Sequence, residues 1–96
     1  MLFEWDENKA RINIEKHGVS FKEASTVFSD ERGILFDDPD HSLEEDRFIL
    51  IGFSSSAKLL IVCHCYRGRD DIIRIISARK ATRSESLQYE ELNEGW

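Results

Sequence analysis

The chain has little proline and little cysteine, and it lacks a long apolar run. Its 96 residues include one proline and five glycines, which is too few for a collagen-like or low-complexity chain. No apolar run approaches the roughly 20 residues of a membrane-spanning helix. The acidic start Met-Leu-Phe-Glu-Trp-Asp lacks the basic and apolar regions of a secretory signal. The sequence therefore predicts a protein of the cytoplasm that does not enter a membrane.

The two cysteines, Cys63 and Cys65, lie in one apolar stretch. Their spacing is a poor disulfide framework and is ordinary for buried thiols in a reducing compartment. Zinc requires about four converging ligands, whereas a strand directs the two cysteines to one face and His64 to the other. The sequence also lacks a P-loop, a dinucleotide fingerprint and a nucleophile elbow. We therefore expect neither a metal site nor a cofactor.

What the sequence does contain is enough apolar residues, 41% of the total, for one packed domain over residues 1–96. The net charge of −6 argues against bulk electrostatic binding of nucleic acid. The charges are unevenly distributed, however. Acidic residues dominate 31–46 and basic residues dominate 67–83. One side of the molecule is therefore suited to a basic partner and the other to an anion.

Capping signals predict helices at both ends of the chain. A short strand, Phe3–Trp5, is followed by Asp6, a good N-cap, and Gly18 suits the end of that helix. Its expected inner face consists of Ala10, Asn13, Ile14 and His17. Two capping boxes, Ser20–Glu23 and Thr82–Glu85, predict the beginnings of a second and a C-terminal helix. The expected apolar positions of these helices are Phe21, Ala24, Val27 and Phe28, and Leu87, Tyr89 and Leu92.

Between these helices the pattern predicts strands at Ile34–Phe36, Arg47–Phe53, Leu59–Tyr66 and Ile72–Ala78. The segments between them, 37–40, 54–57 and 67–71, are turn-like. Such short connections favour an antiparallel meander. The expected fold is α+β, with the short strand and two helices packed on an antiparallel sheet and a helix at the C-terminus. The strands are almost continuously apolar, so both faces need cover. The N-terminal helices can cover one face, which leaves the other for the last helix, a partner or a functional groove.

Arginines within an apolar strand require a partner or a groove. Strict alternation directs Arg74 and Arg79 to opposite faces, so at most one reaches a site above the sheet directly. The other is expected to pair with a carboxylate such as Asp6 or Glu23. His17, at a helix end, is suited either to proton transfer or to satisfying the last helical carbonyls.

Two long motifs resemble a known family. The first motif comprises Phe3-Glu4-Trp5-Asp6, Lys9, Asn13, Lys16-His17-Gly18-Val19-Ser20-Phe21 and Glu23-Ala24. The second comprises Arg74-Ile75-Ile76-Ser77-Ala78-Arg79-Lys80-Ala81 and Tyr89. Together they resemble the BrnT family of bacterial toxins over nearly the whole chain. The resemblance implies a RelE-like fold and a metal-independent ribonuclease that inhibits translation by cutting RNA.

The resemblance also implies a partner. BrnT-like toxins are neutralised by an antitoxin with a ribbon-helix-helix DNA-binding part, in a complex of two toxins with two antitoxins. That complex represses its own promoter, and DNA is contacted through the antitoxin. The antitoxin is expected to cover the cationic groove.

Metal-free RNA cleavage requires a base, an acid and a cation to stabilise the phosphate charge. As catalytic residues we assign Arg67 and Arg79 to phosphate binding and transition-state charge, and His17 to proton transfer. Lys9 and Lys80 are assigned to electrostatic support of substrate binding. Arg74 is either a further substrate contact or a structural residue. The family commonly has Glu-Arg after the long central strand, where this chain has Tyr66-Arg67. The general base is therefore left open.

Two other functions compete with this one. The chain is alternatively a non-catalytic subunit of an autorepressing complex, which the net charge and the missing carboxylate favour. A third hypothesis is a small regulatory enzyme with His17 or Cys65 as nucleophile, although no base is apparent beside either residue. Growth arrest on expression without a partner separates the first two hypotheses.

Overall fold

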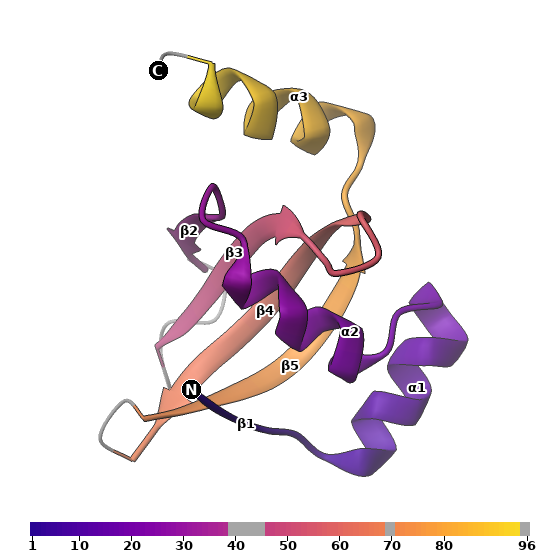
Figure 1. The fold of residues 1–96 in the computed structure, drawn as a ribbon. Helices are drawn as coiled ribbons and strands as arrows, with labels where there is room; N and C mark the ends of the chain where they lie inside the picture. Colours follow the sequence, from indigo (N-terminus) through magenta and orange to yellow (C-terminus); the bar gives the residue numbers. More distant parts are fainter. Residues whose placement is uncertain (39–45, 69–70, 95–96) are drawn as a thin grey trace.

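A mixed five-stranded sheet, in the order β1-β5-β4-β3-β2, forms the centre of the protein (Figure 1). The computed structural model describes residues 1–38, 46–68 and 71–94. The strands are β1 (Leu2–Glu4), β2 (Ile34–Asp37), β3 (Arg47–Phe53), β4 (Leu59–Arg67) and β5 (Ile72–Lys80). The predicted antiparallel meander is confirmed for β2 to β5. β1 pairs with β5 in parallel, which makes the sheet mixed.

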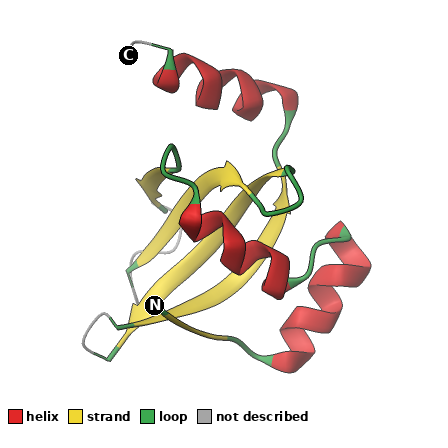
Figure 2. Cartoon of the chain, in the orientation of Figure 1, coloured by secondary structure: helices red, strands yellow, loops and turns green. Residues whose placement is uncertain are grey.

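The helices are α1 (Glu7–His17), α2 (Phe21–Thr26), which continues into a 3₁₀ turn at Val27–Ser29, and α3 (Arg83–Asn93). Figure 2 shows α1 and α2 on one side of the sheet and α3 beyond one end of the strands. Within the described ranges, no helix is long and apolar enough to cross a membrane. The α+β fold expected from the sequence is therefore confirmed.

The helix ends follow the local sequence closely. Asp6 accepts hydrogen bonds from the backbone of Asn8 and Lys9, and Gly18 ends α1 with a φ of 69°. The capping box predicted at Thr82 is complete. The box predicted at Ser20 is half formed, because the Glu23 carboxylate accepts a hydrogen bond from Ser54 Oγ at 2.8 Å instead of returning to the cap. Tertiary contact has replaced a local one.

The main core lies between the sheet and α1 and α2. The helices and the loop between them contribute Ala10, Val19, Phe21, Ala24 and Val27 to this core. The strands contribute Leu50, Leu60, Val62, Ile75 and Ala78. The predicted inner face of α1 is partly wrong. Ala10 and Asn13 are buried, but Ile14 is half-exposed and His17 is exposed. α1 lies beside β5 at the margin of the sheet (Figure 1). The sheet therefore covers a narrower stripe of the helix than the four residues predicted for its inner face.

A β-bulge in β5 changes the orientation of part of the strand. Cys63 pairs with Ser77, but the next residue, His64, pairs with Ile75, so Ile76 has no opposite residue. Ile75 and Ala78 consequently lie in the same buried cluster although they are three positions apart. An extra residue in one strand of an antiparallel pair has this effect.

The bulge overturns the prediction that Arg74 and Arg79 lie on opposite faces. Arg74 precedes buried Ile75 and Arg79 follows buried Ala78, so both arginines point away from the main core. Uninterrupted alternation from Ala78 would place Arg74 in that core. Burying an unpaired charge is costly, which gives a physical reason for the bulge.

Some sequence predictions concern segments that lie outside the described residues. These are Pro39 and Asp40 of the predicted turn at 37–40, and Arg69 and Asp70 of the predicted turn at 67–71. The predicted turn after β3 is observed, with the Ser54 amide donating to the Lys58 carbonyl.

Candidate active site

Among the residues that the structure describes, the sheet face opposite α1 and α2 is covered at one end only. There Tyr89 of α3 packs with Ile51 and Ile61 in a second buried cluster. Its hydroxyl donates to Asp30 Oδ2 at 2.8 Å, which joins α3 to the segment before β2. The sequence left this face for the last helix, a partner or a functional groove, and the last helix covers only part of it. We call the remainder the open face.

A row of paired residues, three of them charged, crosses the open face from strand to strand. Arg47 of β3 is paired with Cys65 of β4, and Cys65 is paired with Arg74 of β5. Arg74 is in turn opposite Glu4 of β1, and Arg74 Nη1 lies 2.6 Å from Glu4 Oε2. Sequence reasoning expected a carboxylate partner at Asp6 or Glu23. The partner of Arg74 is Glu4 because parallel pairing with β1 places the two residues side by side.

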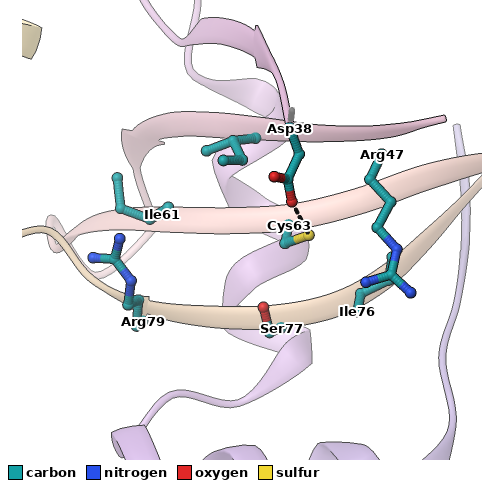
Figure 3. Close-up of a pocket in the computed structure, with 8 residues that line it drawn as sticks. Asp38, Arg47, Ile61, Cys63, Ile76, Ser77 and Arg79 are labelled. Carbon is teal, nitrogen blue, oxygen red and sulfur yellow. Dashed lines mark hydrogen bonds between the residues drawn. The ribbon is translucent and has the colours of Figure 1, made fainter. Parts of the chain in front are cut away.

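A cavity of about 290 Å³ lies on this face. Its lining comprises Asp38, Arg47, Ile49, Ile61, Cys63, Ile76, Ser77 and Arg79. Figure 3 shows Arg47 and Arg79 at opposite ends of the group, with Asp38, Cys63 and Ser77 between them. Because of the bulge, the consecutive residues Ile76 and Ser77 both border the cavity. The site is therefore flanked by two cationic groups and has a carboxylate at its centre.

Arg79 is held by a carboxylate from α3. Its Nη1 and Nη2 atoms donate to Glu85 Oε1 and Oε2, each at 2.8 Å. Hydrogen bonding to Glu85 raises the pKa of Arg79 against the effect of burial. The same contact lowers the pKa of Glu85 to about 2. Both groups are therefore charged at neutral pH, and Glu85 is too weak a base for proton abstraction.

The thiols of the open face are poorly suited to nucleophilic chemistry. Burial, with the nearby Asp38 carboxylate, raises the pKa of Cys63 to about 11, and its Sγ lies 3.7 Å from Asp38 Oδ2. A thiol with such a pKa is almost entirely protonated at neutral pH. Cys65 is buried. The cysteine version of the third hypothesis therefore gains no support from the site.

Arg67 and Tyr66, at the end of β4, point to different faces. Tyr66 packs against Phe48 and His64, on the helix side of the sheet. Alternation then directs exposed Arg67 to the open face. Arg67 is six positions from Ile61, the partner of Arg79, which corresponds to about 20 Å along a strand. The two arginines share a face without converging on one point.

The remaining sequence-predicted site residues lie away from the cavity. Lys9 and His17 are exposed on α1, which packs against β5 through Asn13. Lys80 is paired with core residue Leu60 and alternates with Arg79, so it points away from the open face. None of these residues lines the cavity.

Sequence reasoning missed Arg47, Asp38 and Ser77 as site residues. Arg47 begins an apolar strand and Ser77 interrupts one, and these polar positions were the available signal. Asp38 was assigned only to a turn. It is buried in the structure and its amide donates to the carbonyl of Arg47. Only the pairing of β2 with β3 brings this carboxylate over Cys63.

Comparison with known proteins identifies the family. A family described as "Ribonuclease toxin, BrnT, of type II toxin-antitoxin system" matches residues 5–85. This chain belongs to the BrnT family. No curated protein matches the chain. The BrnT resemblance seen in the sequence is therefore confirmed, and with it membership of a ribonuclease toxin family that implies an antitoxin partner.

A solved BrnT structure agrees with this fold. The chain is similar to the Brucella abortus ribonuclease toxin BrnT, whose crystal structure was determined at 1.1 Å resolution. The TM-score is 0.66 and the sequence identity is 26%, over 86% of this chain and 100% of that chain. The family match ends at Glu85, in the first turn of α3. Most of α3 therefore lies beyond the segment matched to the BrnT family.

Proposed function

We propose that this chain is the toxin of a type II toxin-antitoxin pair and cleaves RNA internally on the open face, without a metal ion, to inhibit translation in the cytoplasm. The observation that carries the proposal is the cavity flanked by Arg47 and Arg79 with Asp38 between them. A chain with a net charge of −6 concentrates these arginines on one sheet face. Phosphate is the ligand that such an arrangement favours.

In the proposed reaction, the 2′-oxygen of RNA attacks the adjacent phosphorus. A base removes the 2′-hydroxyl proton, the bond to the 5′-oxygen breaks, and an acid protonates that leaving oxygen. The products are a 2′,3′-cyclic phosphate and a 5′-hydroxyl. Arg79 and Arg47 would stabilise the added charge at phosphorus, while Arg74 and Arg67 would bind neighbouring phosphates on the same face.

The open face also offers a group for proton transfer. Asp38 is a buried carboxylate on the cavity wall, and we propose it as the general base. His17 remains a prediction from sequence, and it lies on α1 outside the cavity. Lys9 and Lys80 remain proposed for electrostatic support of RNA that extends past the edge of the sheet.

Metal-independent cleavage is supported by the two arginines that flank the cavity. The charge that a metal would supply is available from the guanidinium groups of Arg47 and Arg79. Such groups are permanently charged and can bind a phosphate through two parallel hydrogen bonds.

We propose a ribbon-helix-helix antitoxin as the partner, two of which bind two toxins and carry all DNA contacts. We expect this antitoxin to inhibit the toxin by covering the open face. Exposed acidic residues near β2, namely Glu31, Asp37 and Asp46, support a partner with basic residues. Residues of both signs would then be available on this chain for antitoxin binding.

Induced expression in a bacterial host tests the proposal. We expect growth arrest and cleavage of total RNA from the chain alone, relieved by the neighbouring reading frame. Arg79→Ala should abolish the arrest, whereas Arg11→Ala removes the same charge from exposed α1 and should not. Normal growth with intact RNA and soluble, folded protein would contradict the proposal. That result would favour the non-catalytic subunit of a repressor complex.

A further inference from the structure

Glu85 makes two kinds of contact at once. Its Oε1 atom accepts from the Thr82 amide at 2.8 Å as part of the α3 capping box. Its two oxygens also accept from Nη1 and Nη2 of Arg79. A carboxylate held in this way has little freedom of rotation, so the beginning of α3 imposes an orientation on the arginine.

The contact occupies only one edge of the guanidinium group. A guanidinium has five N–H donors, and Glu85 engages the edge formed by Nη1 and Nη2. Nη1 also donates weakly to the Lys80 carbonyl at 3.3 Å. Among the described residues, no hydrogen bond engages Nε of Arg79. The edge formed by Nε and Nη2 therefore retains two parallel donors that match a phosphate.

Arg79 remains accessible in this arrangement. Its side chain is 41% exposed, and it borders the cavity. The end of β5 is also fixed, because the Ala81 amide donates to the Leu59 carbonyl. An orientation that exists before RNA binds does not have to be established during the reaction.

We propose that Glu85 is a positioning residue for the ribonuclease reaction, holding Arg79 by its Nη edge so that its Nε edge is presented to the scissile phosphate. The inference rests on the proposed function. It assigns to the first turn of α3 a role in catalysis without contact between Glu85 and RNA. An opposite role is conceivable, in which Glu85 masks Arg79 and competes with phosphate. The two roles predict changes of opposite sign when the carboxylate is removed.

The test compares purified Glu85→Gln with the unchanged protein on an RNA oligonucleotide. Glutamine keeps the size of the side chain but loses the charge and one acceptor. We expect kcat to fall about tenfold with KM changed less than about twofold, since a misplaced group loses interactions made in the transition state. In an Arg79→Ala background, the same change should leave the residual kcat unaffected, because Glu85 acts through Arg79.

Two control variants separate positioning from stability. Glu90→Gln removes the same charge from an exposed position of α3 and should leave kcat unchanged. Thr82→Ala removes the hydroxyl cap but keeps the backbone contact with Glu85. It should lower the melting temperature while changing kcat less than about twofold. Circular dichroism of every variant establishes that it is folded.

Three results would overturn the inference while the unchanged protein remains active. The first is a higher kcat, or tighter binding of a 2′-deoxy oligonucleotide, for Glu85→Gln, which would establish masking. The other two are a fall in kcat that is equal with and without Arg79, and no fall in kcat at all. Absence of cleavage by the folded, unchanged protein would instead overturn the proposed function and this inference with it.

Discussion

The two faces of the sheet use similar strand sequences for different purposes. The face under α1 and α2 is packed with residues such as Leu60, Val62 and Ile75, each almost fully buried. The open face has Arg47, Arg74 and Arg79 projecting between isoleucines and cysteines. Its charged groups retain partners or solvent. Under the proposed function, stability and RNA cleavage therefore depend on opposite faces of the same strands.

This division makes a specific claim about mutations. A substitution on the helix-covered face should lower the free energy of unfolding and leave the chemistry of folded molecules intact. Substitution of an arginine on the open face should impair the chemistry and lower the free energy of unfolding less, since these arginines are only partly buried.

The largest effect is expected from Asn13→Ala on the covered face. Asn13 is 5% exposed, donates to the carbonyls of Val19 and Ala78, and accepts from the Ala78 amide. Leaving these buried groups unpaired should cost about 3 kcal/mol of unfolding free energy. Urea unfolding measures the loss, and exposed Asn8→Ala is the control. RNA cleavage per folded molecule should be unchanged, and a large fall in it would break the division between faces.

Asp38→Asn on the open face should reduce kcat about 100-fold, as expected for loss of a general base. His17→Ala, outside the cavity, should change kcat less than about twofold under the same proposal. Cleavage kinetics of both variants on one RNA oligonucleotide compare the two groups directly. A fall in kcat for His17→Ala alone would instead assign proton transfer to His17 on α1 and would exclude Asp38 as the general base.

Arg47→Ala should reduce kcat/KM about tenfold, because one of the two cations that flank the cavity is removed. Its unfolding free energy should fall by no more than about 1 kcal/mol, well below the loss expected for Asn13→Ala. Arg11→Ala is the matched control for charge. Equal kinetics for the two variants would remove Arg47 from the site and leave Arg79 as the cation of the cavity.

Tyr89→Phe tests the packed cluster that α3 forms beside the open face. Burial and the hydrogen bond to Asp30 raise the pKa of Tyr89 to about 12, so the hydroxyl is a donor at every physiological pH. Its loss should cost about 1 kcal/mol in thermal unfolding. Tyr66→Phe, whose hydroxyl makes no hydrogen bond within the described residues, should cost less. Equal losses would show that the Asp30 contact does not fasten α3.

The final difference between the faces depends on pH. His64 is fully buried on the covered face with Nε2 unpaired among the described residues, and burial lowers the pKa of His64. The unfolded chain therefore binds the proton more strongly than the folded one. The contribution of neutral His64 to stability is fully present above the unfolded pKa of about 6.5 and is lost as the pH falls below it.

Replacing this histidine should remove that dependence. Urea midpoints of His64→Leu, measured between about pH 7.5 and 5, should fall less than those of the unchanged protein. Exposed His17→Gln should retain the original slope. Parallel curves for the unchanged protein and His64→Leu would mean that another group is responsible.

Predictions based on neighbouring residues succeeded where the interaction is local. The N-cap at Asp6, the left-handed Gly18 and the Thr82 box involve atoms within one helical turn, and all are observed. The prediction for Glu23 was incomplete because a distant residue, Ser54, binds its carboxylate. The same reason explains why Glu85 was treated only as part of a cap, although it also binds Arg79.

The sequence by itself determined the helix ends, the antiparallel strands and the α+β class, because capping and hydrophobic pattern depend on residues close together in the chain. Its two long motifs indicated the family. Tertiary structure alone decided which arginines share a face. The bulge at Ile76 forms against β4 and reverses the orientation of Arg74, and β2 must pair with β3 before Asp38 reaches Cys63. Strand register joins residues far apart in the chain, and shifting it by one position exchanges the two faces of the sheet.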